Sequence, residues 1–342
     1  MRVLRALLVL SVLAIAGLVL AYQGLQRWLD TPLAIDGAAL FLEVPRGQAL
    51  AATADDLAAR GVLTHPQLFS VYARLTGADA RVRAGEYELR SGTTPRTLLE
   101  QLQAGVVVEH SVTIVEGWTF RELRRVLERE PLLEHVMAGR SDAELMRELG
   151  EPDRHPEGLF FPDTYFFERG TTDLELLRRA RVRMQQELQA AWRGRAEDLP
   201  IDSEYQALIL ASIVEKETAL ASERPRIAGV FTQRLRRGML LQTDPTVIYG
   251  LGESFDGNLR RSDLQRDGPY NTYTRAGLPP SPIAAPGAAA LRAAVQPDER
   301  GELYFVATGL PDGSHRFSKT LAEHNRAVAE YLARYRRRGA ER

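Results

Sequence analysis

Two glutamates near the middle of the chain are the side chains best placed to do chemistry. Both lie in Leu208-Ile-Leu-Ala-Ser-Ile-Val-Glu-Lys-Glu-Thr218, an apolar run that predicts a helix. Glu217 continues the apolar face of that helix, whereas Glu215 points to the other side. Burial disfavours a charged carboxyl, so Glu217 should have a raised pKa and could donate a proton near neutral pH, as a glycosidase acid does. The apolar face consists of Leu210, Ile213 and Val214.

The same pattern has a structural explanation, in which Glu217 pairs with an arginine elsewhere in the fold or marks the frayed end of the helix. A standard glycosidase also needs a second carboxylate. Spacing alone does not choose that partner, and both questions stay open at this point. The candidates for the second acid are Glu215, Glu157, Asp163, Asp244 and Glu223.

Two segments that follow the glutamates carry the side chains that a carbohydrate site requires. Such sites combine flat apolar faces with a few amides, hydroxyls and carboxylates. Any one of these residues could simply pack within its own loop. Together with Glu217 they favour a saccharide substrate over other enzyme substrates. The candidate substrate-binding residues are Glu215, Gln242, Thr243, Asp244, Tyr270, Asn271 and Tyr273.

The composition of the 342-residue chain excludes several kinds of site. It has no cysteine, so disulfides, thiol nucleophiles and thiolate metal ligands are ruled out. Its six histidines form no helical ligand pair, and neither a Gly-x-Ser-x-Gly elbow nor a phosphate-binding glycine loop is present. We therefore expect no metal and no cofactor. The formal net charge of −1 gives no field that would recruit nucleic acid.

The N-terminus predicts a membrane anchor. Residues 6–26 carry no charge, close to the roughly 20 residues that a spanning helix needs. Arg2 and Arg5 precede this run, and the positive-inside rule then keeps the N-terminus in the cytoplasm and exports the rest. A cleaved signal peptide, processed near Ala14-Ile15-Ala16, is the alternative. We favour the anchor because the apolar run continues past that point.

The remaining chain predicts an α+β protein of several parts. A linker at 27–36 leads to a small module at 37–110, and the rest, 111–342, forms a mixed domain that is mainly helical over 118–200. Within the small module the pattern is strand, helix, helix, strand, helix. These elements are expected at 39–44, 49–60, 66–75, 85–89 and 95–102.

A set of ordered motifs carries a family resemblance. They include Ala211-Ser-Ile-Val-Glu-Lys-Glu-Thr218, Leu241-Gln-Thr-Asp-Pro-Thr-Val-Ile-Tyr-Gly250, Tyr270-Asn-Thr-Tyr-Thr274 and Gly277-Leu-Pro-Pro280. Phe161-Pro-Asp-Thr-Tyr165 and Leu303-Tyr-Phe-Val306 fit the same pattern. Over essentially its whole length the chain resembles the endolytic murein transglycosylases, the YceG-like (MltG) family.

The resemblance implies a single-pass protein of the inner membrane, with a cytoplasmic N-terminus and a periplasmic catalytic domain. It also implies a LysM-like module and a lysozyme-like helical active-site region. Members cleave nascent peptidoglycan strands between N-acetylmuramic acid and N-acetylglucosamine, leave 1,6-anhydro ends and so set strand length. Peptidoglycan synthases are the partners that the family suggests.

The family's catalytic glutamate is the second acid of the Glu-x-Glu-Thr motif, which implies Glu217. In such an enzyme one residue is first acid and then base, and no second carboxylate is needed. A hydrolytic muramidase and a non-catalytic peptidoglycan-binding scaffold are the competing hypotheses.

Overall fold

The structure is a computed structural model that describes residues 2–340, and side chains over 4–337. The terminal residues 1 and 341–342, which belong to the expected anchor and catalytic segments, lie outside the described part. The chain divides into two compact units. The first contains the residues up to His110 together with Phe166–Gly170, and the second contains Ser111–Tyr165 and the residues from Thr171 onward.

Unit 1 begins with a long apolar helix, α1 (Arg2–Leu29). The segment Leu4–Leu29 contains an 18-residue window with a mean hydropathy of 2.5 and is long and apolar enough to cross a membrane. The helix extends into the segment that the sequence analysis took as a linker. Its last residue, Leu29, is buried, and Leu33 beyond it joins the core of the unit, because both are apolar.

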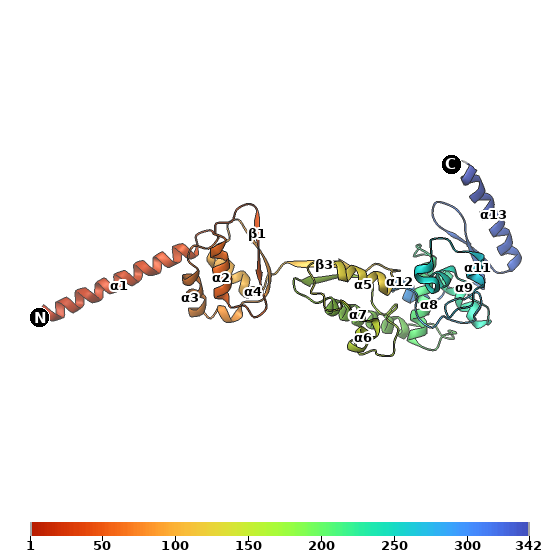
Figure 1. Ribbon diagram of the computed structural model, residues 1–342, viewed down its shortest axis with the longest axis horizontal. Coiled ribbons are helices and arrows are strands. Elements are labelled where there is room, and N and C mark those ends of the chain that lie inside the picture. The colour runs from red at the N-terminus through yellow and green to blue at the C-terminus, as the bar shows by residue number, and fades with distance from the viewer. Residues whose placement is uncertain (1, 341–342) are drawn as a thin grey trace. The chain divides into compact units, whose positions relative to one another are not determined.

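The rest of unit 1 is a two-stranded antiparallel sheet covered by helices (Figure 1). Strand β1 (Ala39–Val44) pairs with β2 (Gly85–Arg90), with Leu42 opposite Tyr87. Leu42 and Tyr87 are fully buried and point into the core. The covering helices are α2 (Leu50–Ala59), α3 (Pro66–Leu75) and α4 (Pro95–Ala104), with the short turn η1 (Asp79–Arg81) between α3 and β2.

Helix α4 shows how local sequence fixes these boundaries. Thr94 and Thr97 form a reciprocal capping box, and Pro95 occupies the first turn, where its missing N–H costs nothing. Gly105 ends the helix at φ +67°, a conformation that glycine adopts without strain. The predicted strand and helix order of this module matches the structure.

Unit 2 is mainly helical. Strand β3 (Glu109–Thr113), which starts in unit 1, pairs with β4 (Thr164–Glu168), and β5 (Tyr304–Ala307) forms an antiparallel hairpin with β6 (His315–Ser318). The helices are α5 (Phe120–Arg129), α6 (Asp142–Glu148), α7 (Asp173–Arg193), α8 (Glu204–Glu217), α9 (Arg224–Arg236), α10 (Asp244–Leu251), α11 (Arg261–Gln265), α12 (Ala288–Val295) and α13 (Leu321–Ala340), with the turn η2 (Gly252–Ser254) after α10.

Helix α8 lies at the centre of this unit. Helices α7, α9, α10 and α12 all pack against it, and α8, α9 and α12 are grouped together in Figure 1. Ser203 caps its first turn by accepting a hydrogen bond from the amide of Gln206. The long loop that precedes α12 donates the amide of Ile283 to the hydroxyl of Ser212 in the middle of α8. The helix that carries both candidate acids is therefore fixed by contacts with four helices and with the loop before α12.

Candidate active site

The environment of α8 corrects one step of the sequence argument. The single apolar face expected on this helix is absent, because residues 207–214 are all buried. Glu215, expected to point away from the apolar face, has a side chain that is only 4% exposed. Four neighbouring helices cover α8, so helical spacing cannot separate the two acids by burial. Their bonding partners separate them instead.

Glu217 is the last residue of α8 and is half-buried. Its carboxylate accepts a hydrogen bond from the hydroxyl of Thr243, which lies just before α10. In the described part of the chain, no arginine, lysine or histidine forms an ion pair with it. The structural explanation, in which an arginine neutralises this acid, thus finds no such partner for Glu217.

Burial is the main reason why the pKa of Glu217 rises to about 7. The hydrogen bond from Thr243 opposes the rise, the negative charge of Asp244 adds to it, and the positive charge of Arg234 opposes it. The position at the C-terminal end of a helix acts in the same direction as burial, since the helix dipole disfavours a carboxylate there. The side chain can therefore carry a proton at neutral pH and release it.

Glu215 is bonded quite differently. The Nη2 of Arg224 lies 2.6 Å from its Oε1, and the amide of Gly287 donates to its Oε2 at 3.0 Å. Burial still raises the pKa of Glu215, while the Gly287 bond and the charge of Arg224 oppose the rise. The pair joins the end of α8 to the start of α9 and α12. Its assignment as a substrate-binding residue stays a prediction, and the contacts favour a positioning role.

The two segments with candidate sugar-binding residues meet at Thr272. The amide of Thr243 donates to the Thr272 hydroxyl at 3.1 Å, and the amide of Gln242 donates to the Thr272 carbonyl at 3.1 Å. Thr246 adds a third link, with its hydroxyl 2.8 Å from that of Thr272. These buried bonds hold the Gln242–Thr243 segment beside Glu217.

Two of the predicted residues form a polar pair next to Thr243. The hydroxyl of Tyr273 donates to Asp244 at 2.5 Å. Burial raises the pKa of Tyr273, and the charges of Asp244 and Glu217 raise it further, which places its ring within the field of the acid. Gln242 is exposed and has a φ of +48°, an unusual conformation for a side chain with a Cβ. Such backbone strain occurs most often where function requires the geometry.

The other two predicted residues are used within their own loop. Asn271 is 5% exposed and donates to the carbonyls of Asp263, Leu264 and Arg266 while accepting from the amide of Tyr273. Tyr270 shares a hydrogen bond of 2.7 Å with Ser281. A role in binding substrate stays a prediction for both, and the contacts of Asn271 indicate that it shapes the loop.

Glu157 is a second acid with a pKa near neutrality. It is 3% exposed, and burial raises its pKa to about 7 although the amide of Phe120 and the hydroxyl of Tyr249 bond to it. The Tyr249 ring meets that of Tyr270 edge-on at 4.8 Å. Through Tyr249, Glu157 therefore stabilises α10 and the tyrosine loop (Tyr270–Thr274). Asp163, another candidate for the second acid, borders together with Tyr165 a surface depression of about 640 Å³ along α7.

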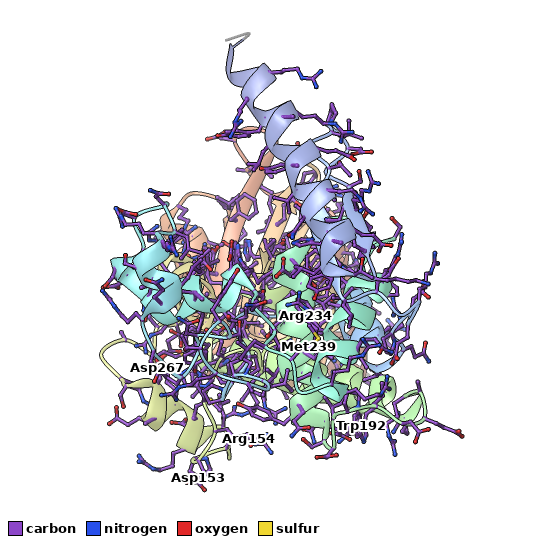
Figure 2. The ribbon with its side chains drawn as sticks, turned by 90° about the vertical axis from the view of Figure 1, so that its right-hand side faces the viewer. Asp153, Arg154, Trp192, Arg234, Met239 and Asp267 are labelled. Carbon is purple, nitrogen blue, oxygen red and sulfur yellow. The ribbon has the colours of Figure 1, made fainter. Side chains whose placement is uncertain are left out.

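Arg234 of α9 is the residue that the sequence analysis missed. It follows Ile227, Val230 and Phe231 at the spacing with which Glu217 follows its own apolar neighbours. A charged residue that continues the apolar face of a helix could therefore have been identified from the sequence as a candidate. Figure 2 shows Arg234 beside Met239, whose amide donates to the Arg234 carbonyl at 2.9 Å. Among the described residues, no group of three or more His, Asp or Glu side chains is arranged to hold a metal ion.

Comparison with known proteins identifies the family. The model of the YceG-like family matches residues 42–330, which include most of unit 1 beyond α1 and all of the site described above. The chain belongs to the YceG-like family.

Two curated relatives of this family member are endolytic murein transglycosylases by name. That of Bacillus subtilis (strain 168) is 32% identical over 309 residues, covering 85% of this chain and 84% of the relative. That of Streptococcus pneumoniae serotype 2 (strain D39) is 28% identical over 348 residues, covering 91% of this chain and 62% of the relative.

A solved structure agrees with the fold. The crystal structure of a YceG-like protein from Listeria monocytogenes, at 2.6 Å, matches 84% of this chain and 98% of that protein. The TM-score is 0.52 and the sequence identity is 29%. The resemblance stated from the motifs is thus confirmed at the level of the family.

Proposed function

We propose that this protein is an endolytic murein transglycosylase that cleaves the β-1,4 bond between N-acetylmuramic acid and N-acetylglucosamine in nascent glycan strands. The names of its relatives support the reaction and the substrate. The observation that carries the residue assignment is the bonding of Glu217, a half-buried acid with a pKa of about 7 that is bonded to a hydroxyl and, among the described side chains, to no cation. Cleavage inside strands would set their length.

The proposed reaction needs one proton carrier. Protonated Glu217 donates to the oxygen that leaves with N-acetylglucosamine, and the bond from the muramyl C1 to this oxygen breaks with its electron pair on the oxygen. The muramyl C6 hydroxyl then attacks C1, and its proton passes to the Glu217 carboxylate. The product is a 1,6-anhydro end, and Glu217 is again protonated for the next cycle.

The surrounding residues would hold the glycan against this acid. Gln242 is exposed beside Thr243 and can offer an amide to an acetamido group. Tyr273 and Tyr270 offer ring faces, and Asp244 offers a carboxylate to sugar hydroxyls. Glu215 and Asn271 keep the helix and the loop in place through the bonds described above.

Helix α1 supports a proposal for the location of the protein. Its side chains from Leu4 on are apolar and exposed over most of its length, and Arg5 precedes the uncharged run. We propose that it anchors the protein once in the inner membrane, with the N-terminus in the cytoplasm and the catalytic unit in the periplasm. The β1, α2, α3, β2 order of unit 1 supports a LysM-like module, and the helical surroundings of α8 support a lysozyme-like region. Peptidoglycan synthases as partners stay a prediction.

The decisive experiment is mass spectrometry of uncrosslinked glycan strands digested by the full chain and by its Glu217→Gln variant. We expect internal cleavage with 1,6-anhydromuramyl ends from the first and roughly 10³-fold less of it from the second. Reducing ends without the anhydro product would indicate a hydrolytic muramidase. A folded Glu217→Gln variant that cleaves at the wild-type rate, or a folded wild-type chain that binds strands without cleaving them, would contradict the proposal.

A further inference from the structure

Arg234 is a buried arginine that bonds only to backbone oxygens in the described part of the chain. The residue is only 8% exposed to solvent. Its Nε donates to the carbonyl of Leu303 at 2.7 Å, and its Nη1 donates to the carbonyls of Leu240 and Leu241 at 3.2 and 2.8 Å. No carboxylate of the described residues lies within ion-pair distance of it. The positive charge is therefore held inside the protein without a negative partner.

Holding an unpaired positive charge away from water costs free energy, so other interactions of the guanidinium must offset that cost. Burial lowers the pKa of Arg234, because removal from water disfavours the guanidinium. The ring of Tyr304 lies 5.2 Å from the guanidinium carbon and compensates in part through its π face. A chain that needed only packing here could place an apolar side chain instead at lower cost. The cation therefore requires an explanation.

The three carbonyls give the first part of that explanation. Leu240 and Leu241 directly precede Gln242 and Thr243, and Thr243 is the residue that bonds to Glu217. Leu303 lies just before β5, in a segment remote from α9 in sequence. Arg234 thus fastens the segment that carries Thr243 to α9 and to the start of β5. The left-handed backbone of Gln242 follows directly after these fastened carbonyls.

The field at Glu217 gives the second part. The polar groups that act on this carboxyl are Thr243 by a hydrogen bond, Asp244 by a negative charge and Arg234 by a positive charge. Tyr273, whose hydroxyl donates to Asp244, also lies within the field of Glu217, since the charge of Glu217 raises the pKa of Tyr273. Of the groups named, only Arg234 is cationic. Donation of the proton leaves a half-buried carboxylate, and a preformed positive charge stabilises that anion with little reorganisation.

We propose that Arg234 is a positioning residue for the reaction, one that fixes the Thr243 segment against Glu217 and supplies the positive charge that the Glu217 carboxylate needs after it has given up its proton. The inference rests on the proposed function. It adds a partner to what would otherwise be a single-residue mechanism. Arg234 acts through Glu217 and through the backbone, without contact with the glycan.

The test compares four substitutions in the purified full chain: Arg234→Met, Arg234→Gln, Arg234→Lys and, as the matched control, Arg237→Met. Arg237 is an exposed arginine just beyond the end of the same helix. Two quantities are measured from pH 5 to pH 9. One is the rate of anhydromuramyl formation on uncrosslinked strands. The other is the infrared carboxyl band that the Glu217→Gln variant lacks, which reports the protonation of Glu217 without catalysis.

Both neutral variants should move the protonation midpoint of Glu217 upward, by up to about one pH unit, because the positive charge of Arg234 is gone. The alkaline limb of the rate profile should move with it. At the optimum, Arg234→Met should lose on the order of 100-fold in rate, and Arg234→Gln less because an amide can still donate to a carbonyl. Arg234→Lys should keep the midpoint and lose roughly 10-fold, since it keeps the charge but not the three bonds. Arg237→Met should match the wild type.

An unmoved midpoint in folded Arg234→Met or Arg234→Gln would overturn the inference, as would equal losses in the lysine and methionine variants. If Arg234→Met fails to fold, the glutamine variant decides. A midpoint that moves in a chain that cleaves no glycan would support the link between Arg234 and Glu217 while contradicting the proposed function. The two failures are therefore distinguishable.

Discussion

Each of the two units contains a glutamate removed from water, buried in the case of Glu86 and half-buried in that of Glu217, and their surroundings differ in kind. In unit 1, Glu86 accepts hydrogen bonds from Arg169 at 3.1 and 3.0 Å and lies 2.7 Å from the Nε2 of His110. Burial alone would raise its pKa, but the bonds and charges of these two residues together lower it. In unit 2, Glu217 has a hydroxyl where Glu86 has a guanidinium, and its pKa rises to about 7.

The contrast shows that burial does not make an acid catalyst by itself. A buried carboxylate with bonded cations is committed to its charged form and fastens parts of the chain together. A buried carboxyl bonded to a neutral donor can exist in either form near pH 7. Glu215 lies between these cases, since burial raises its pKa while Arg224 binds it. The partner of the acid sets its pKa, and exposure then separates the acids that remain, since Glu157 also has a pKa of about 7 but is only 3% exposed.

The largest difference that we expect between these acids is in activity. Glu217→Gln should reduce anhydromuramyl formation by roughly 10³-fold, within the range of general acid catalysis. Glu215→Gln should cost about 10-fold, because Arg224 would lose its main partner and the end of α8 would loosen. Rates on uncrosslinked strands measure both, with far-ultraviolet circular dichroism as the check on folding. Equal losses in folded variants would remove the distinction between the two acids.

The second expected effect is a gain in stability. The pKa of Glu217 is about 7 in the folded chain against 4.5 for an ordinary glutamate in water, so the folded state binds its proton more tightly than the unfolded state. Its contribution therefore falls as pH rises from about 4.5 to about 7. The Glu217→Gln variant has no carboxyl to ionise, so its free energy of unfolding does not fall in this pH range. It should exceed that of the wild type by up to about 3 kcal/mol at pH 8, with little difference at pH 4. Denaturant unfolding at both pH values tests the sign.

Glu86 should show the opposite dependence. Its lowered pKa means that it stabilises unit 1 above its unfolded pKa and that this contribution is lost as pH falls through the folded pKa. Glu86→Gln should cost about 1.5 kcal/mol at pH 7, and the deficit should shrink below about pH 4. Hydrogen exchange of the β1 and β2 amides reports unit 1 separately. A deficit independent of pH would mean that shape, and not charge, is what Glu86 contributes.

The smallest effect that we expect follows removal of the Thr243 hydroxyl and is a change in the rate profile. Thr243→Val keeps the size of the side chain but removes the hydrogen bond to Glu217. The charged form of the acid loses support, so the alkaline limb of the rate profile should move upward, and the rate should fall about 10-fold, equivalent to about 1.4 kcal/mol. Thr274→Val, which removes an exposed hydroxyl bonded to Asp267, is the matched control. A wild-type profile for Thr243→Val would show that the hydroxyl does not tune the acid.

Local signals predicted much of this molecule. Strand alternation, glycine stops and proline starts gave the elements of unit 1, and an ordered set of motifs gave the family. The surroundings of the acids were not predictable in this way. Glu215 takes a hydrogen bond from the amide of Gly287, and Arg234 donates to the carbonyl of Leu303, so these partners come from segments that are distant in the sequence. Only the fold brings these together, as it returns Phe166–Gly170 to unit 1.

Helix α1 has a kinetic consequence if the proposed anchor is correct. A tether converts an encounter between two freely diffusing molecules into a search within a thin layer, where the effective concentration of substrate depends on reach and not on bulk amount. Strands that are still growing at the same membrane would be met often, and finished strands farther away only rarely. A slow enzyme would then suffice. Its preference for new strands over old ones would come from the distance of the strands from the membrane as much as from its binding site.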